Sequence, residues 1–175
     1  MLKTIALIAM TMIAAILIYA ATKPDTFHVQ RSTHIAAPPE KVFGLIEDLP
    51  QWASWSPWEK MDPAMKKSYG GAPKGTGAIL NWDGNADVGT GRMEIVSTVP
   101  ASQVVIKLDF LKPFEAHNQA EFTLEGSGTT TTVTWAMHGP QPFMMKVMDV
   151  VMGMDKMVGK DFETGLANLK QLAEH

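Results

Sequence analysis

Residues 153–170 read GMDKMVGKDFETGLANLK and repeat apolar side chains at steps of three and four. This spacing predicts an amphipathic helix with a single apolar stripe. The stripe consists of Met154, Met157, Val158, Phe162, Leu166, Leu169 and Leu172 or Ala173. Strand patterns dominate the chain before this helix, and an apolar stripe needs a surface to cover, so we expect the helix to lie against a β-sheet.

Methionine is concentrated around this helix. Six of the thirteen methionines lie in residues 140–175, at Met144, Met145, Met148, Met152, Met154 and Met157. The methionine side chain is unbranched and adapts to irregular surfaces. A methionine-rich helix on a sheet is therefore either part of an ordinary core or the wall of a cavity for an apolar guest.

Strand and turn patterns precede the helix. Residues 26–37 alternate as a half-buried strand does, and Pro38, Pro39 and Glu40 then open a short helix, because proline suits a first helical turn. About six further strands follow between residues 65 and 137, separated by turn residues. This order predicts an α+β fold in which an antiparallel sheet is covered by one long C-terminal helix.

The first residues differ in character from the rest. Residues 4–22 carry no charged side chain, and roughly 20 such residues cross a bilayer core as a helix. A cleaved signal peptide would have an apolar run of about 7 to 15 residues and a small-residue cleavage site, which residues 19–22 match poorly. A buried helix of a soluble domain would show a polar face. We therefore favour an uncleaved transmembrane anchor in residues 1–24 over a signal peptide, followed by one domain in residues 25–175.

Charges flanking the apolar segment predict its orientation. Lys3 and the amino terminus lie on one side, and Lys23, offset by Asp25, lies on the other. Positive charge favours the cytoplasmic side, so the bias is toward a cytoplasmic N-terminus. We expect a single-pass membrane protein whose domain lies on the outer side, periplasmic or extracellular.

Composition excludes several functions. The net charge is -3 and no stripe of lysine and arginine is present, so nucleic acid is not an expected partner. The chain has no cysteine, which excludes disulfides, thiolate nucleophiles and cysteine-ligated metals. Its histidines show no metal-ligand spacing such as His-Glu-x-x-His. We expect no metal and no other cofactor.

Ionisable residues fall on the outer faces of the predicted strands. Lys107 and Asp109, for example, alternate with the apolar residues Ile106 and Leu108. This pattern leaves the inner face apolar and presents no catalytic motif, so it favours a binding protein over an acid–base enzyme. A β-bulge would reverse the pattern locally, and the glycines of residues 89–91 offer a place for one.

A few polar residues are nevertheless expected on the inner face, namely Arg31, Asn81, Ser97 and Asn118. Such groups would orient a guest in an otherwise apolar pocket. For Arg31 we favour the alternative that it lies at an edge or pairs with a carboxylate such as Glu94 or Asp109, since buried charges are normally paired.

Three tryptophans, Trp52, Trp55 and Trp58, are spaced by three residues after the short helix. One helical turn would place them on the same side. They would form either an aromatic lid over a pocket mouth or an anchor that holds the short helix to the sheet. Packing is the favoured interpretation, because large aromatic side chains usually belong to cores.

Several segments carry a family likeness: VQRS at residues 29–32, IAAPPEKVF at 35–43, the tryptophan segment 52–58 and GLANLK at 165–170. Together they resemble the SRPBCC superfamily, which includes START-type lipid-transfer proteins, pollen-allergen-like proteins and polyketide cyclase/dehydrase-like proteins. The resemblance covers about residues 26–174. It implies a helix-grip fold, a curved antiparallel sheet wrapped around a long C-terminal helix with a cavity between them, and it transfers no catalytic motif to this chain.

We therefore expect a membrane-anchored domain that binds a hydrophobic small molecule or lipid between the sheet and the C-terminal helix. The expected ligand-binding residues are Arg31, Ile106, Phe122, Trp135, Met137, Met154, Met157 and Phe162. One alternative is a polyketide cyclase/dehydratase-like enzyme, which would need Arg31, Glu94, Asp109 or His138 turned inward. Another is a cell-envelope assembly or interaction protein with a vestigial cavity. The sequence predicts no particular protein partner for any of these functions.

Overall fold

A seven-stranded antiparallel sheet forms the body of the protein. The computed structural model describes residues 1–175, except for the side chain of Ser127. The strand order is β1-β7-β6-β5-β4-β3-β2, so all neighbours except β1 and β7 are consecutive in sequence. The strands are β1 (Thr26–Ile35), β2 (Lys66–Gly71), β3 (Ala78–Asp83), β4 (Thr90–Val99), β5 (Gln103–Lys112), β6 (Ala116–Ser127) and β7 (Thr130–Pro140).

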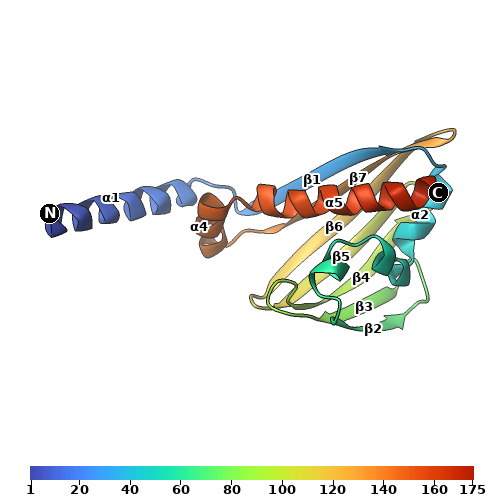
Figure 1. Cartoon of the computed structure of the whole chain (residues 1–175), viewed down its shortest axis with the longest axis horizontal. Coiled ribbons are helices and arrows are strands. Elements are labelled where there is room, and N and C mark those ends of the chain that lie inside the picture. The colour runs from blue at the N-terminus through green and yellow to red at the C-terminus, as the bar shows by residue number, and fades with distance from the viewer.

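One long helix lies along this sheet. Figure 1 shows α5 beside β1 and β7, α4 between α1 and the start of α5, α2 near the C-terminal end of α5, and α1 extending away from the body. The helices are α1 (Leu2–Ala21), α2 (Pro39–Glu47), α3 (Trp58–Met61), α4 (Phe143–Met152), α5 (Met154–Glu174) and the 3-10 helix η1 (Leu49–Ser54). The predicted α+β helix-grip fold is confirmed, as is the number of strands.

The core lies between the inner face of the sheet and α5. The sheet contributes buried Ile106, Phe122, Val133 and Trp135, and α5 contributes buried Phe162, Leu166, Leu169 and Ala173. Burial of each large side chain stabilises the fold by about 1.5–3 kcal/mol. Hydrophobic contact is therefore what holds α5 on the sheet, as the apolar stripe predicted.

Gly153 divides the predicted C-terminal helical region in two. Its φ of 73° lies in the left-handed region, where glycine is not strained, so α4 ends there and α5 begins in a new direction. The four methionines before Gly153 therefore belong to α4 and do not face the sheet. The prediction that these methionines face the sheet is therefore wrong, because the part of the apolar stripe that contacts the sheet begins after Met157.

Helix α1 leaves the domain and makes contact mainly with α4. Ala20 is its one buried residue. The helix is long and apolar enough to cross a membrane, a property that it shares with signal sequences. Lys146 of α4 fixes the junction, because its Nζ donates to the Lys23 carbonyl and to the Asp25 carboxylate, while Lys23 pairs with Asp149 at 2.8 Å.

Candidate functional site

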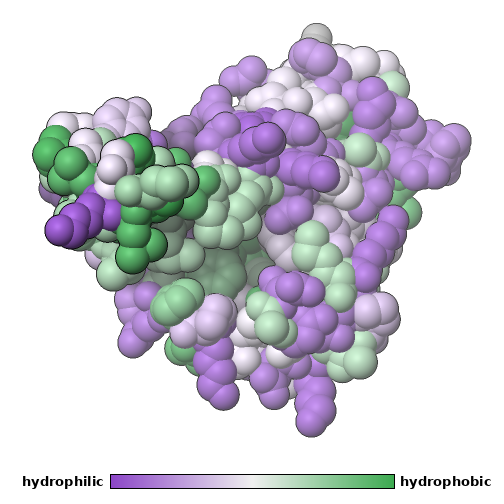
Figure 2. All heavy atoms as spheres, turned by 60° about the vertical axis from the view of Figure 1, so that its left-hand side comes forward, coloured by the Kyte–Doolittle hydropathy of each residue, from purple (hydrophilic) through white to green (hydrophobic). Residues whose placement is uncertain are grey.

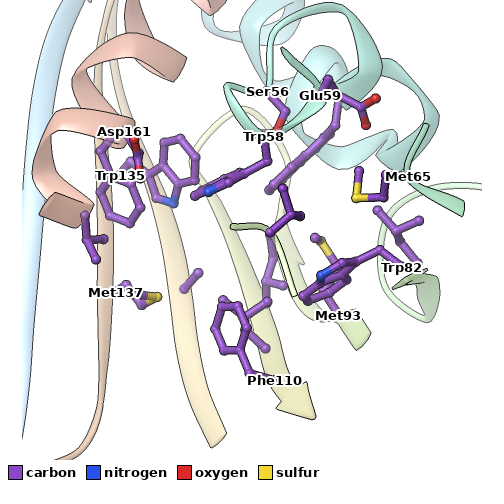
Figure 3. A pocket seen from close by; sticks show the side chains of 18 residues that line it. Ser56, Trp58, Glu59, Met65, Trp82, Met93, Phe110, Trp135, Met137 and Asp161 are labelled. Carbon is purple, nitrogen blue, oxygen red and sulfur yellow. The ribbon is translucent and has the colours of Figure 1, made fainter. Parts of the chain in front are cut away.

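A cavity of about 180 Å³ lies between the sheet, α5 and the segment that runs from η1 into α3. Figure 3 shows Trp58 and Trp135 on the side of α5, and Trp82, Met93 and Phe110 across the cavity from them. Its lining is largely apolar and consists of Trp52, Ser56, Trp58, Glu59, Met65, Leu80, Trp82, Val88, Met93, Ile106, Leu108, Phe110, Ala120, Trp135, Met137, Val158, Asp161 and Phe162.

Strand alternation explains how the sheet lines the cavity. Ile106, Leu108 and Phe110 follow one another at period two along β5, and Trp135 and Met137 do the same on β7. Successive side chains of a strand point to opposite faces, so these residues share the inner face. The charged residues between them are left on the outer face, as the sequence predicted.

Trp135 is at the centre of an aromatic cluster. Its ring stacks on Phe162, with ring centroids 4.1 Å apart and planes 7° from parallel, and on Phe122, at 4.8 Å and 28°. Trp58 meets the same ring edge-on at 5.7 Å. Such pairs contribute roughly 0.5–1.5 kcal/mol beyond burial. The cluster therefore fixes the Trp135 indole in one orientation beside the cavity.

The indole nitrogen of Trp135 is a buried donor that lacks an acceptor. Its Nε1 has no hydrogen-bond partner among the described residues, and the side chain is only 2% exposed. In Figure 3 this nitrogen points toward the interior of the cavity. Leaving a buried donor unpaired costs about 1–3 kcal/mol. The lining of the site is thus largely apolar, and this N–H is a buried donor that no described residue satisfies.

Two carboxyl groups also border the cavity. Burial raises the pKa of Asp161 above its ordinary value, an effect that the charge of Lys160 partly offsets. Glu59 forms two 2.7 Å contacts with the Lys67 ammonium, which neutralises it. Of these two carboxyl groups, Asp161 is therefore the one whose protonated form burial favours.

The tryptophan segment serves mainly as an anchor. Trp52 donates its Nε1 hydrogen to the Ile46 carbonyl at 2.9 Å, and Trp55 donates to the Leu45 carbonyl at 3.2 Å. Both rings are buried, which agrees with the packing interpretation. Trp58 differs because its side chain is only partly buried, and it lines the cavity together with Trp52.

The expected ligand-binding residues divide into two groups. Ile106, Trp135, Met137 and Phe162 all line the cavity. Phe122 is fully buried behind Trp135 and takes part in the stacking, although it is not in the lining. Met154 and Met157 lie on the first turn of α5, outside the lining, and Met157 is 50% exposed.

Arg31 lies outside the cavity, beside α5. Its guanidinium contacts Asp155 at 3.0 Å and Glu163 at 2.7 Å, and Arg31 is not part of the cavity lining. Asp155 and Glu163 raise the pKa of Arg31, and Arg31 lowers that of Asp155. Arg31 is thus paired with carboxylates, as the favoured alternative predicted. Its partners are Asp155 and Glu163 of α5, and not Glu94 or Asp109.

The other polar inner-face candidates are mostly misplaced. Register shifts interrupt β4 between Thr90 and Gly91, where a bulge was expected, and between Ile95 and Ser97. The second shift turns Ser97 to the exposed outer face, and Asn81 is exposed as well. Asn118 remains inside, with a buried Oδ1 that has no hydrogen-bond partner among the described residues.

The ionisable residues expected of an enzyme do not reach the cavity. Glu94 pairs with Arg92 at 2.6 Å, and Asp109 contacts Lys107 and His117. His138 is exposed. Among the described residues no group of three metal-ligating side chains occurs.

Sequence reasoning missed several lining residues. Leu80 and Trp82 share the inner face of β3 at period two, so the same alternation test finds them. Asp161 was not predicted, because only apolar residues define the stripe and an aspartate within it is not counted. It lies three residues after Val158 and four after Met157, which is the spacing of the stripe, so helical periodicity could have placed it on the side of the helix that faces the cavity.

The cavity opens at the end of the sheet from which α1 leaves. Figure 2, turned so that this end comes forward, shows a hollow of hydrophobic character beside the hydrophobic surface of the N-terminal region. Phe110, at the end of β5, and Val158, on the second turn of α5, belong to the lining at this end. A guest would therefore enter beside α1.

Comparison with known proteins supports the fold. The aromatase/cyclase Zhui from Streptomyces sp. R1128 is 15% identical, with a TM-score of 0.62 over 85% of this chain and 94% of that one. Protein CV1439 from Chromobacterium violaceum is 15% identical, with a TM-score of 0.59 over 87% and 99%. DynU16, a protein in the dynemicin biosynthetic locus, is 20% identical, with a TM-score of 0.60 over 87% and 48%.

Sequence comparison identifies the family. Among curated proteins none matches the chain. Residues 26–174, nearly the whole domain after α1, match the family described as polyketide cyclase / dehydrase and lipid transport. The helix-grip architecture and this match agree with one another. The chain therefore belongs to the polyketide cyclase / dehydrase and lipid transport family, within the SRPBCC superfamily.

Proposed function

We propose that the protein is a membrane-anchored binding protein for a hydrophobic small molecule or lipid, held between the sheet and α5. The observation that carries this proposal is the cavity of about 180 Å³, whose lining is apolar apart from Ser56, the unpaired Nε1–H of Trp135 and two carboxyl groups. Cavities of this kind bind apolar ligands and use a few polar groups to orient them.

The Trp135 donor narrows the chemistry of the guest. An acceptor placed opposite Nε1 would remove the cost of the unpaired N–H, and it would be selected over a purely apolar molecule. We infer a guest with an apolar skeleton and at least one carbonyl, ether or hydroxyl oxygen. This class includes oxygenated polycyclic molecules as well as lipids.

Helix α1 provides the membrane anchor in this proposal. Its length and apolar composition suit a bilayer span, and it projects from the domain with Ala20 as its one buried residue. The flanking charges at Lys3 and Lys23 favour a domain on the outer side. Residues 1–24 would then be the anchor and residues 25–175 the binding domain.

A matched pair of ligands tests the binding proposal. Fluorene and 9-fluorenone share one tricyclic skeleton and differ in a carbonyl, and each can displace the fluorescent probe N-phenyl-1-naphthylamine from the full-length protein in detergent. We expect both to bind, and fluorenone to bind about three- to tenfold more tightly, the contribution of one hydrogen bond. Trp135→Phe should remove that preference while fluorene binding is retained. Failure of all three compounds to bind would refute the proposal.

Asp161 supports a second candidate function, a cyclase/dehydratase-like enzyme. Loss of water from a β-hydroxyketone requires a group that moves a proton, and the raised pKa of Asp161 suits that task. The family includes polyketide cyclases by its description. The test substrate is 4-hydroxy-4-phenylbutan-2-one, which would lose water to give a conjugated enone that absorbs in the ultraviolet. Turnover by the wild type that Asp161→Asn abolishes would establish the enzyme, and no turnover would leave the binding protein.

A further inference from the structure

The most exposed apolar side chains of the domain gather at one end. Outside α1, every described large hydrophobic residue with at least 50% exposure lies in the β5–β6 hairpin, in α4 or on the first turn of α5. We call six of them the apolar rim: Leu111, Phe114, Phe143, Met144, Val151 and Met152. Their exposures run from 50% to 68%. Exposed apolar groups that cluster in this way mark an interaction surface.

Sheet register places all parts of the rim together. Phe110 at the end of β5 pairs with Ala116 at the start of β6, and Thr26 at the start of β1 pairs with Pro140 at the end of β7. Because the strands are antiparallel, these positions share one end of the sheet. Figure 1 shows the hairpin, α4 and the exit of α1 at that same end.

Polar contacts hold the rim in a fixed position relative to α1. Lys146 is buried in α4, and its ammonium binds Asp25 and the carbonyl of Lys23, directly after α1. Lys23 in turn pairs with Asp149 of α4. The helix that would cross the bilayer and the helix that carries most of the rim therefore form one unit.

The rim also borders the entrance of the cavity. Leu111 of the rim follows the lining residue Phe110, and α4 leads through Gly153 into the turn of α5 that carries the lining residue Val158. Figure 2 shows the hollow and the hydrophobic surface side by side. An apolar molecule could pass from one to the other without entering water.

We propose that the apolar rim rests in the surface of the lipid bilayer beside α1, so that the cavity opens onto the membrane and takes up its guest from the lipid. This inference rests on the proposed function for its anchor and its guest. We choose the bilayer as the surface that covers the rim because α4 packs against α1. If α1 spans the membrane and ends at Ala21, α4 lies at the level of the lipid headgroups. Amphipathic helices with exposed aromatic and aliphatic residues bind at that depth.

Single cysteine labels test the position of the rim, since the chain has no cysteine of its own. The full-length protein, labelled with the fluorophore NBD, is reconstituted into phosphatidylcholine vesicles that contain nitroxide-labelled lipid. The variants are Phe114→Cys, Met144→Cys and Val151→Cys in the rim, Ile8→Cys in α1, and Ser102→Cys in the exposed turn at the opposite end of the sheet. We expect the nitroxide to quench the rim and α1 labels, and to leave the Ser102 position unquenched.

The outcomes separate this inference from the proposed function. If the label at Ile8→Cys is quenched and the rim labels are not, α1 is in the membrane but the rim is not, which would overturn this inference and leave the proposed anchor intact. No quenching at Ile8→Cys would overturn the anchor and the seating together. A rim that stays in water, while unlabelled Met144→Cys forms a disulfide between two copies when a mild oxidant such as copper phenanthroline is added, would overturn the proposal in favour of self-association.

A second experiment tests uptake from the membrane. N-phenyl-1-naphthylamine is loaded into vesicles, and its arrival in the cavity is followed by energy transfer from tryptophan. We expect the rim variant Met144→Glu/Val151→Glu to slow transfer about tenfold and to keep its affinity for the probe in detergent. The control is Val96→Glu/Val99→Glu, two exposed positions at the far end of the sheet. Equal rates for rim and control variants would overturn the proposal.

Discussion

Helices α4 and α5 adjoin at Gly153 and are both amphipathic, yet they bury opposite kinds of side chain. Helix α5 buries Phe162, Leu166 and Leu169 on the sheet, whereas the buried residue of α4 is Lys146. Four apolar residues of α4, Phe143, Met144, Val151 and Met152, are left exposed. An apolar stripe on a helix therefore predicts that some surface covers it, but it does not predict which surface. For α5 the surface is the sheet, and for α4 we propose the bilayer.

The largest effect that separates the two helices should come from removing one apolar side chain from each. Phe162→Ala removes the ring stacked on Trp135 and should lower the free energy of unfolding by about 3–5 kcal/mol. Val151→Ala in α4 should change it by less than about 0.5 kcal/mol, because Val151 is exposed. Chemical denaturation in detergent measures both, and equal losses would mean that α4 also belongs to the core.

The next largest effect should come from filling the space where α5 packs closely against the sheet, at Gly165. A Cβ added at Gly165 would lie 2.8 Å from Cζ3 of Trp135 and 3.2 Å from Cδ of Pro57. Gly165→Ala should therefore destabilise the protein by about 1–3 kcal/mol. The control is Gly44→Ala in α2, where nothing lies within 4 Å of the added methyl group, and there the same change should stabilise by about 0.5–1 kcal/mol. A neutral Gly165→Ala would show that α5 shifts easily on the sheet.

Lys146→Met tests whether polar contacts, and not apolar burial, position α4. The change removes the bonds to Asp25 and to the Lys23 carbonyl while it keeps the apolar stem. Hydrogen exchange of α4 amides should accelerate by about tenfold, the equivalent of one charge-assisted hydrogen bond. Exchange in α5 should be unchanged. Unaltered exchange in α4 would show that its packing on α1 suffices.

The smallest effect concerns the pH dependence of stability at two aspartates of α5, Asp161 and Asp155, which face different surroundings. Burial raises the pKa of Asp161, so the folded state holds its proton more tightly and stability falls as pH rises through that pKa. Asp161→Asn should therefore raise the melting temperature at pH 7 more than at pH 4.

Asp155 provides the matched control. Arg31 lowers its pKa, so its contribution is present above the ordinary pKa of about 3.8 and is lost in acid. Asp155→Asn should lower the melting temperature at pH 7 and have little effect in acid. The same sign for both variants would contradict the assignment of Asp161 to the cavity wall.

The strands and the long helix could be predicted because their signals are local. Period-two alternation placed Ile106, Trp135 and Met137 on the inner face, and the stripe of α5 placed Phe162. Ser97 was misplaced because a bulge inserts one residue and reverses every later side chain. Met154 and Met157 were misplaced because helical spacing gives the stripe but does not tell where along it the sheet begins.

The sequence by itself determined the element order, the apolar inner face and the family likeness, since each depends on the periodicity or identity of neighbouring residues. Only the tertiary structure decided which residues meet. Arg31 joins Asp155 and Glu163, and Asp161 reaches the cavity, through contacts between residues far apart in sequence. Gly153 separates a helix that belongs to the sheet from one that does not, and that division depends on the partner each helix finds in space.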